Sequence, residues 1–177
     1  MKELVFIGDS LTEYYDWQSR FPAYRVQNLG VAGETVEGLL ERLAITKLLS
    51  LPDYIFVMTG INNLWNRQNI ILPLYERVLA RMETEFTGAG IVVQSILPVA
   101  LWVDADLIVH INQSLRALAS ARSMYYLDIH GNFIGADGRL IRSYLEMDGV
   151  HLTHEGYAAW AGVIEKFLAT RYNGLRV

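Results

Sequence analysis

Short, continuously apolar runs rich in Val, Ile, Phe and Tyr recur along the chain. They lie at residues 4–7, 55–58, 91–93 with 96 and 97, and 125–129, and a weaker one lies at 25–29. Runs that are apolar throughout, rather than at every second residue, indicate strands buried on both faces. Such strands are typical of parallel sheets that helices cover on both sides.

The segments between these runs carry apolar residues at helical spacing. Their apolar positions are 36, 39, 40, 43 and 48; 74, 78, 82 and 86; 107, 111, 115 and 118; and 158, 161, 164 and 168. Strand and helix therefore alternate, which predicts an α/β protein with a small, doubly wound sheet of five strands. Ligand sites in such sheets lie beyond the carboxyl ends of the strands, so the residues after each apolar run are the candidates for chemistry.

The composition is that of one globular domain. The chain has 177 residues, of which 52% are apolar and 19% charged, and no linker, repeat or low-complexity tract divides it. We therefore expect a single domain over residues 1–177. The net charge is −4, with 15 basic and 19 acidic residues spread along the chain. Without a basic stripe to neutralise phosphates, nucleic acid is not an expected partner.

The chain contains no cysteine, which excludes disulfides, thiolate zinc sites and a cysteine nucleophile. Any nucleophile must then be an oxygen or a lysine. The first apolar run, at residues 4–7, is too short for a signal peptide. The longest apolar candidate for a membrane span, residues 91–103, is interrupted by two polar residues and Pro98. We expect a soluble, cytoplasmic protein without a membrane span.

Ser10 directly follows the first apolar run, in the sequence Gly8-Asp9-Ser10. With Glu13 three residues later it fits a capping box, in which Ser10 is the N-cap of a helix and Glu13 reaches back to it. A catalytic serine needs in addition a neutral imidazole within hydrogen-bond reach and a carboxylate that holds the imidazole tautomer.

Among the four histidines, His151 follows a carboxylate in a glycine-containing loop. Asp148 precedes it by three residues, and a turn of that length can bring the carboxylate within reach of the His151 Nδ1. Asp148 could instead be a simple turn former before Gly149. A metal site made of Asp148, His151 and His154 is a weaker hypothesis, because the i, i+4 spacing of helical metal ligands is missing.

Two further loops offer hydrogen-bond donors for a developing oxyanion. Gly30 and Gly33 lie between the second run and the helical segment that follows it, and glycine permits backbone geometries that present an N–H to a ligand. Asn62 follows the third run, two residues after Gly60, where its side-chain amide could add a donor. Taken alone, the glycine loop is more simply a tight turn, and the asparagine-rich loop needs no function either.

Together these segments resemble the SGNH or GDSL-type serine hydrolases. Residues 8–11 match the nucleophile block of that family, 28–33 its glycine block, 60–63 its asparagine block and 148–151 its terminal Asp-x-x-His block, in the family's order. The resemblance implies a flavodoxin-like, three-layer α/β/α sandwich that uses no metal and no cofactor. One position departs from the pattern: Asn63 stands where the family usually has aspartate, which leaves the hydrogen bonding of this loop open.

The same resemblance assigns a role to each matched position. It makes Ser10 the nucleophile, His151 the general base and then the general acid, and Asp148 the residue that orients His151. The oxyanion would be held by the backbone N–H groups of Ser10 and Gly33 and by the Asn62 side chain.

The expected reaction is hydrolysis of a small-molecule carboxylic ester, with a short to medium acyl chain, through an acyl-enzyme; a thioester or a lysophospholipid is a further candidate substrate. Activity should rise with pH as His151 loses its proton. Carbohydrate O-deacetylation, acyl transfer by the same residues and a non-catalytic binding module stay open as alternatives. The sequence predicts no oligomeric state.

Residues in the loops after the strands are the candidates for the substrate pocket. They are Asp9, Trp65, Leu101 and Trp102. Tyr14, Tyr15 and Trp17 lie in the first of these loops as well, but large aromatic side chains more often pack the core.

Overall fold

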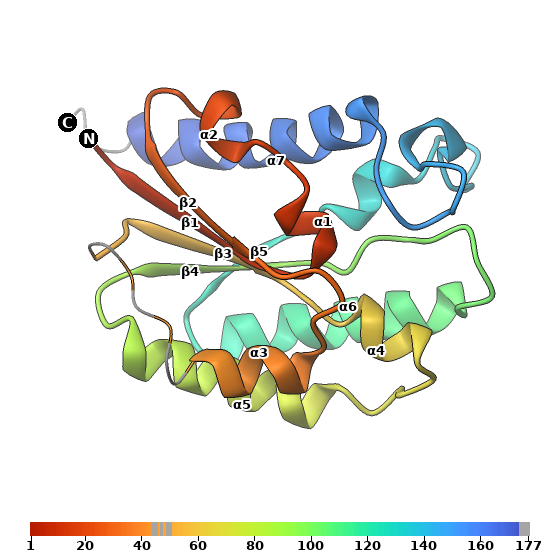
Figure 1. Ribbon diagram of the computed structural model, residues 1–177, viewed down its shortest axis with the longest axis horizontal. Helices are drawn as coiled ribbons and strands as arrows, with labels where there is room; N and C mark the ends of the chain where they lie inside the picture. Colours follow the sequence, from red (N-terminus) through yellow and green to blue (C-terminus); the bar gives the residue numbers. More distant parts are fainter. Residues whose placement is uncertain (44–45, 47, 49–50, 174–177) are drawn as a thin grey trace.

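A computed structural model describes residues 1–43, 46, 48 and 51–173 of the chain (Figure 1). Its centre is a sheet of five parallel strands in the order β2-β1-β3-β4-β5. The strands are β1 (Glu3–Gly8), β2 (Arg25–Gly30), β3 (Tyr54–Met58), β4 (Gly90–Gln94) and β5 (Tyr125–Leu127). The first strand of the chain therefore lies inside the sheet, and β2 and β5 form its edges.

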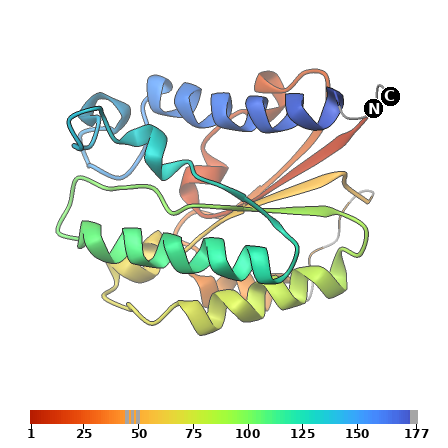
Figure 2. The same ribbon diagram turned by 180° about the vertical axis from the view of Figure 1, so that it is seen from behind.

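Helices cover both faces of the sheet. The long ones are α3 (Val36–Leu43), α5 (Leu72–Glu85), α6 (Ala105–Ala121) and α7 (His154–Asn173), and the short ones are α1 (Ser10–Glu13), α2 (Trp17–Arg20), α4 (Ile61–Trp65), η1 (His130–Phe133) and η2 (Arg142–Tyr144). α2 and α7 lie over one face, and α3, α5 and α6 lie over the other (Figures 1 and 2). The prediction of a three-layer α/β/α sandwich with a five-stranded parallel sheet is confirmed. Within the described residues, none of the helices combines the length and the apolarity that a membrane crossing requires.

The apolar pattern locates the inner strands well and misjudges some ends. β4 ends at Gln94, so Ile96 and Leu97 lie in the loop after it, where both side chains are buried. Burial, rather than strand pairing, explains their apolar character. β2 is the least apolar run because it is an edge strand that pairs with β1 alone and stays partly exposed.

Aromatic rings fill the core between the sheet and the α2–α7 layer. The Phe6 ring stacks on Trp17, with 4.2 Å between the ring centroids, and on Phe56, with 5.0 Å. Trp17 is 1% exposed, and its indole N–H donates to the Thr12 carbonyl. Trp17 therefore packs the core and does not belong to a substrate pocket.

Two glycines let the loops after β1, β2 and β3 approach one another. A Cβ atom on Gly8 would lie 2.1 Å from the Met58 carbonyl oxygen, and one on Gly30 would lie 2.3 Å from the Glu13 backbone nitrogen. Neither position has room for a side chain. The loops therefore meet at the carboxyl edge of the sheet, where ligand sites of such folds form.

Candidate active site

Ser10 is the first residue of α1 and directly follows Asp9, which leaves the carboxyl end of β1. Its side chain is nearly buried, with 7% exposed. The N-cap of α1 is Asp9, whose Oδ1 accepts a hydrogen bond from the Leu11 N–H at 3.0 Å. The predicted capping box is thus wrong by one residue, because the Asp9 carboxyl takes the capping position. The Ser10 hydroxyl is not used for capping.

The Ser10 hydroxyl lies beside the His151 imidazole. The distance from Ser10 Oγ to His151 Nε2 is 3.1 Å, and His151 Nδ1 lies 2.6 Å from Asp148 Oδ2. A carboxylate can only accept a hydrogen bond, so the network assigns the proton to Nδ1 and presents the lone pair of Nε2 to the Ser10 hydroxyl. This is the arrangement of hydroxyl, imidazole and carboxylate that acyl transfer by a serine requires.

Hydrogen bonds hold Asp148 in its ionised form. Its Oδ1 accepts from the N–H groups of Val150 and His151, at 2.9 and 3.0 Å. Partial desolvation acts to raise the pKa of the Asp148 carboxyl, but the hydrogen bonds from the His151 ring and from both backbone N–H groups outweigh it and lower the pKa to about 2. Because the folded pKa lies below the ordinary value of 3.8, this group stabilises the fold above that pH and loses its contribution as the pH falls toward 2.

The loop of residues 142–152 carries both the imidazole and the carboxylate. Inside it, the Glu146 N–H donates to the His151 carbonyl at 2.8 Å. The Arg142 guanidinium donates to three successive carbonyls, those of residues 145–147, at 3.3, 2.9 and 3.4 Å. The loop is therefore fixed from within, immediately before the carboxylate that orients His151.

Three candidate donors for an oxyanion line one cavity with the Ser10 hydroxyl. The Ser10 N–H belongs to the first turn of α1, where backbone N–H groups lack a helical partner. Gly33, at φ +76°, lies in a turn closed by a 3.1 Å hydrogen bond from the Glu34 N–H to the Val31 carbonyl. The Asn62 amide donates one hydrogen to the Glu34 carbonyl at 3.0 Å, which leaves its second hydrogen for a ligand.

Glu13 supports the glycine loop instead of capping α1. Its Oε2 accepts a hydrogen bond from the Ala32 N–H at 2.7 Å, next to Gly33. The loop after β2 is thereby tied to α1, the helix that begins with Ser10. Sequence reasoning missed this contact because it joins loops that follow different strands, and their proximity depends on the close approach at Gly30.

Asn63 is fully buried and fixes the start of α3. Its Oδ1 accepts from the Val36 N–H at 2.9 Å, and its amide donates to the Glu37 carboxylate at 2.6 Å and to Gln68 Oε1 at 3.2 Å. An aspartate here would face the Glu37 carboxylate as a like charge. Asn63, which stands where the family usually has aspartate, is therefore accommodated by the Glu37 carboxylate. Its hydrogen bonds hold the loop that carries Asn62.

A cavity of about 340 Å³ opens beside the Ser10 hydroxyl. Apart from the site residues already described, its wall consists of Tyr14, Ala32, Ile61, Trp65, Val99, Leu101, Val103 and Val150. Trp65 and Leu101 thus lie where they were predicted. Val99 and Val103, on either side of Leu101, were missed because they read as a continuation of the apolar run of β4.

Two predicted pocket residues lie outside this wall. Trp102 packs against Trp65, with 5.7 Å between the ring centroids, and remains 53% exposed. Asp9 is only 1% exposed, because its carboxyl turns inward to cap α1. The prediction of Asp9 as a pocket residue is therefore corrected: it is a buried group behind Ser10, and burial raises its pKa to about 7.

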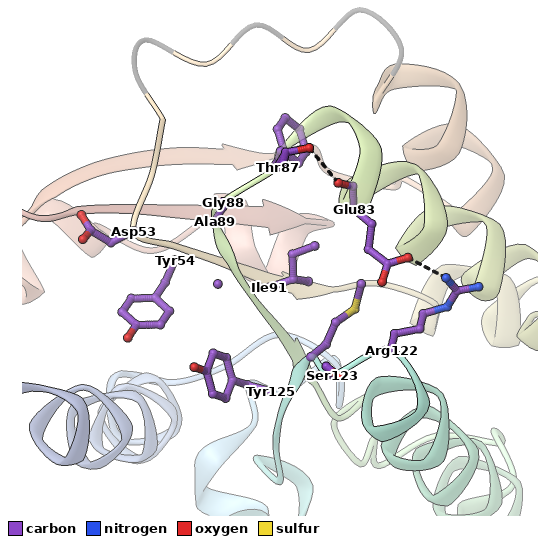
Figure 3. Close-up of a pocket in the computed structure, with 13 residues that line it drawn as sticks. Asp53, Tyr54, Glu83, Thr87, Gly88, Ala89, Ile91, Arg122, Ser123 and Tyr125 are labelled. Atoms are coloured by element: carbon purple, nitrogen blue, oxygen red, sulfur yellow. Dashed lines mark hydrogen bonds and ion pairs between the residues drawn. The ribbon is translucent and has the colours of Figure 1, made fainter. Parts of the chain in front are cut away.

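A larger cavity, of about 520 Å³, lies at the opposite edge of the sheet (Figure 3). It is framed by the amino ends of β3, β4 and β5, and its walls include Tyr54, Tyr125 and the ion pair of Glu83 with Arg122 at 2.7 Å. None of its described lining residues is a histidine, so it lacks the hydroxyl, imidazole and carboxylate arrangement of the smaller cavity. The chemistry places the candidate active site at the smaller cavity.

In comparisons with known proteins, the matched part of the chain includes every residue of this site. The chain matches the model of the GDSL-like lipase/acylhydrolase family over residues 6–159. It is similar to the platelet-activating factor acetylhydrolase IB subunit alpha2 of Rattus norvegicus, with 29% identity over 164 residues that cover 88% of this chain and 71% of that protein.

Two solved structures share the fold. A Streptococcus pneumonia protein described in connection with platelet activating factor is 28% identical, with a TM-score of 0.86 and coverage of 94% of this chain and 84% of that one. A catalytic mutant of an acetylxylan esterase from Geobacillus stearothermophilus is 20% identical, with a TM-score of 0.76 and coverage of 93% of both chains. The likeness thus extends over nearly all elements that position the site.

Proposed function

Because this chain belongs to the GDSL-like lipase/acylhydrolase family and is an ester hydrolase, we propose that it hydrolyses short-acyl esters through a triad of Ser10, His151 and Asp148. The observation that carries the proposal is the continuous hydrogen-bonded chain from Ser10 Oγ to Asp148, with distances of 3.1 and 2.6 Å, at the edge of an apolar cavity.

In the acylation step, Ser10 Oγ attacks the ester carbonyl while His151 Nε2 takes the hydroxyl proton. The carbonyl oxygen becomes negative as the tetrahedral intermediate forms, and the N–H groups of Ser10 and Gly33 and the free hydrogen of the Asn62 amide receive it. Asp148, ionised at neutral pH, holds the imidazole tautomer and stabilises the imidazolium.

The intermediate collapses when the alcohol leaves with the proton from His151, which forms the acyl-enzyme. Water then repeats the sequence: His151 takes its proton, the hydroxide attacks the acyl carbonyl, and Ser10 is released with the proton. The leaving alcohol must lie on the His151 side of the cavity, next to Tyr14, whose ring centroid is 5.4 Å from that of His151.

The cavity supports a short acyl group. Its volume of about 340 Å³ lies at the small end of the usual range for ligand pockets, roughly 300–1,000 Å³. The acyl group and part of the alcohol must share this space. The similarity to an acetylhydrolase agrees with this size, so we infer that acetyl esters are among the preferred substrates.

Labelling with a fluorophosphonate probe, read by intact mass, tests the nucleophile. We expect one label on the wild type and none on Ser10→Ala. Ser114→Ala is the matched control. Ser114 lies on α6, its Oγ donates to the His110 carbonyl, and it does not line the cavity beside Ser10. A label that persists on Ser10→Ala would contradict the proposal, and a folded wild type that neither labels nor cleaves any ester would favour a binding module.

The same preparations, given p-nitrophenyl acetate, butyrate and octanoate, size the acyl pocket. We expect kcat/KM for acetate or butyrate to exceed that for octanoate by at least about tenfold, because the extra methylenes find no room. If kcat/KM were highest for octanoate, the cavity would have to accommodate a longer acyl chain than its volume predicts. An added alcohol that takes up the acyl group in place of water would identify an acyltransferase.

Replacing Asn62 with alanine is expected to lower kcat by about 10² to 10³, with a smaller change in KM, because one oxyanion donor is lost. Asn132→Ala is the control, since its amide also donates to a backbone carbonyl, that of Asp128, at 3.0 Å. Steady-state kinetics with p-nitrophenyl acetate measure the effect. Wild-type kcat in Asn62→Ala would remove this amide from the oxyanion site.

A further inference from the structure

Three buried polar atoms behind Ser10 have no hydrogen-bond partner in the part of the chain that the structure describes. They are Asp9 Oδ2, Thr59 Oγ1 and the Tyr75 hydroxyl; Thr12 Oγ1 on α1 and Arg20 Nε on α2 are also buried without a partner among the described residues. All three side chains are 1% exposed or less. Buried polar atoms are almost always hydrogen-bonded, so three orphans beside a nucleophile call for a physical explanation.

The three groups come from neighbouring elements. The register of β1 with β3 pairs Gly8 with Met58, so Asp9 and Thr59 leave the sheet side by side. α5 covers this point: the Ile71 side chain, just before α5, lies 3.0 Å from the place of a Cβ on Gly60, which follows Thr59. Tyr75 is one helical turn beyond Ile71, and so lies on the same side of the helix.

The electrostatics agree with this placement. Burial raises the pKa of Tyr75, a contact of its hydroxyl with the Thr59 backbone lowers that pKa, and the charge of Asp9 raises it. Asp9, Thr59 and Tyr75 therefore form one buried cluster, which we name the Asp9 cluster.

No cation compensates a charge on Asp9. The titratable groups that interact electrostatically with its carboxyl are Glu34, His151, Tyr75 and Tyr157. Glu34 repels a negative charge and is itself paired with Arg42, through contacts of 2.6 and 2.7 Å. His151 would attract it only when protonated, which is the inactive form of the base. Among the described residues, no lysine or arginine forms an ion pair with Asp9.

We propose that Asp9 is a positioning residue that works in its uncharged form, with Oδ1 capping α1 and the proton carried on Oδ2 inside the Asp9 cluster. The inference rests on the proposed function of Ser10. Its basis is that a carboxyl oxygen buried without a hydrogen-bond partner and without an ion pair disfavours the charged form of Asp9. An uncharged Asp9 also keeps negative charge away from the oxyanion, which forms on the substrate oxygen that the Ser10 N–H binds.

Ionisation of Asp9 should therefore inhibit the enzyme. A buried negative charge next to the Ser10 N–H opposes the charge that develops on the substrate oxygen. Burial raises the pKa of Asp9 to about 7, so the charged form accumulates on the alkaline side of neutrality.

The pH dependence of Asp9→Asn tests the proposal. In the wild type, kcat/KM for p-nitrophenyl acetate should fall by about tenfold between neutral pH and about pH 9. In Asp9→Asn the fall should be less than about twofold, because the amide keeps an Oδ1 acceptor and cannot ionise. Asp16→Asn is the matched control, since Asp16 caps α2 through a 3.0 Å bond to the Ser19 N–H, and should keep the wild-type profile.

A second measurement needs no variant. Infrared spectra of the wild type, titrated with pH, should contain a carbonyl band of a protonated carboxyl group that persists above about pH 5, where ordinary carboxyls are ionised, and disappears near neutral pH. If Asp9→Asn folds, the band should be missing from it. The wild-type spectrum shows whether a protonated carboxyl group is present even if Asp9→Asn fails to fold.

The proposal is overturned by an alkaline fall that is as steep in Asp9→Asn as in the wild type, or by the lack of the protonated carboxyl band at about pH 5 to 6. Failure of the proposed function itself has another signature. In that case the wild type would take no fluorophosphonate label at Ser10 and would show no ester hydrolysis at any pH, whereas the infrared band of Asp9 would still be present.

Discussion

Replacing Ser10 or His151 with alanine is expected to lower kcat by about 10⁶, and replacing both is expected to lower it no further. The reason is that the two groups act in one step. Without the Ser10 oxygen the imidazole has no proton to accept, and without His151 the hydroxyl stays a weak nucleophile. The 3.1 Å contact between them is the only link from the hydroxyl to a base in the described site.

Turnover of p-nitrophenyl acetate by the two single variants, the double variant and Ser114→Ala measures this coupling. Residual hydrolysis that remains in the double variant comes from the oxyanion donors and from binding alone. Additive losses would mean that Ser10 and His151 act independently, which the proposed acyl-enzyme does not allow. Intact folding is checked by thermal denaturation of each variant.

Replacing Asp148 with asparagine is expected to lower kcat by about 10⁴ while the fold is kept. The asparagine Oδ1 can still accept from the N–H groups of Val150 and His151. Its amide then faces His151 Nδ1 and donates to it, so that the proton moves to Nε2. The imidazole would present a proton, instead of a lone pair, to the Ser10 hydroxyl.

Asp137→Asn is the control for this substitution. Asp137 Oδ1 accepts from the backbone N–H of Arg139 two residues later, at 3.0 Å, as Asp148 Oδ1 does from Val150, but Asp137 lies outside the site. The control should keep wild-type kcat. A loss of less than about tenfold in Asp148→Asn would show that the backbone, rather than this carboxylate, orients His151.

The arrangement of the chain was predictable because it depends on local patterns. Continuous apolar runs marked strands that are buried on both faces, and the polar residues after them fell at one edge of the sheet. Asp148 and His151 are three residues apart, so their contact depends on a single turn. Ser10 and His151 are far apart in sequence, and their contact was predictable only because the order of the motifs matched a known family.

The hydrogen bonds between loops were not predictable in the same way. Asp9 and Ser10 are both good N-caps, and the folded chain uses Asp9, whose Oδ1 accepts from the Leu11 N–H. Glu13 bonds to Ala32, and Asn63 bonds to Glu37. Each of these pairs joins segments that meet only in the folded sheet, so no local pattern contains it.

The loop of residues 142–152 has a consequence for how the enzyme loses activity. Several of its contacts are internal to the loop. They are the β-bridge between Leu145 and Leu152, the hydrogen bond from the Glu146 N–H to the His151 carbonyl, and the hydrogen bonds from the Arg142 guanidinium to the carbonyls of residues 145–147. The Ala100 N–H also donates to the Gly149 carbonyl at 2.8 Å, which ties the loop to the segment after β4. We expect the loop to open and close as one unit when that tie is released. His151 and Asp148 then leave or enter the active site together. Mild heat or denaturant should therefore reduce the number of active molecules, without producing molecules that keep one of these two residues in place and lose the other.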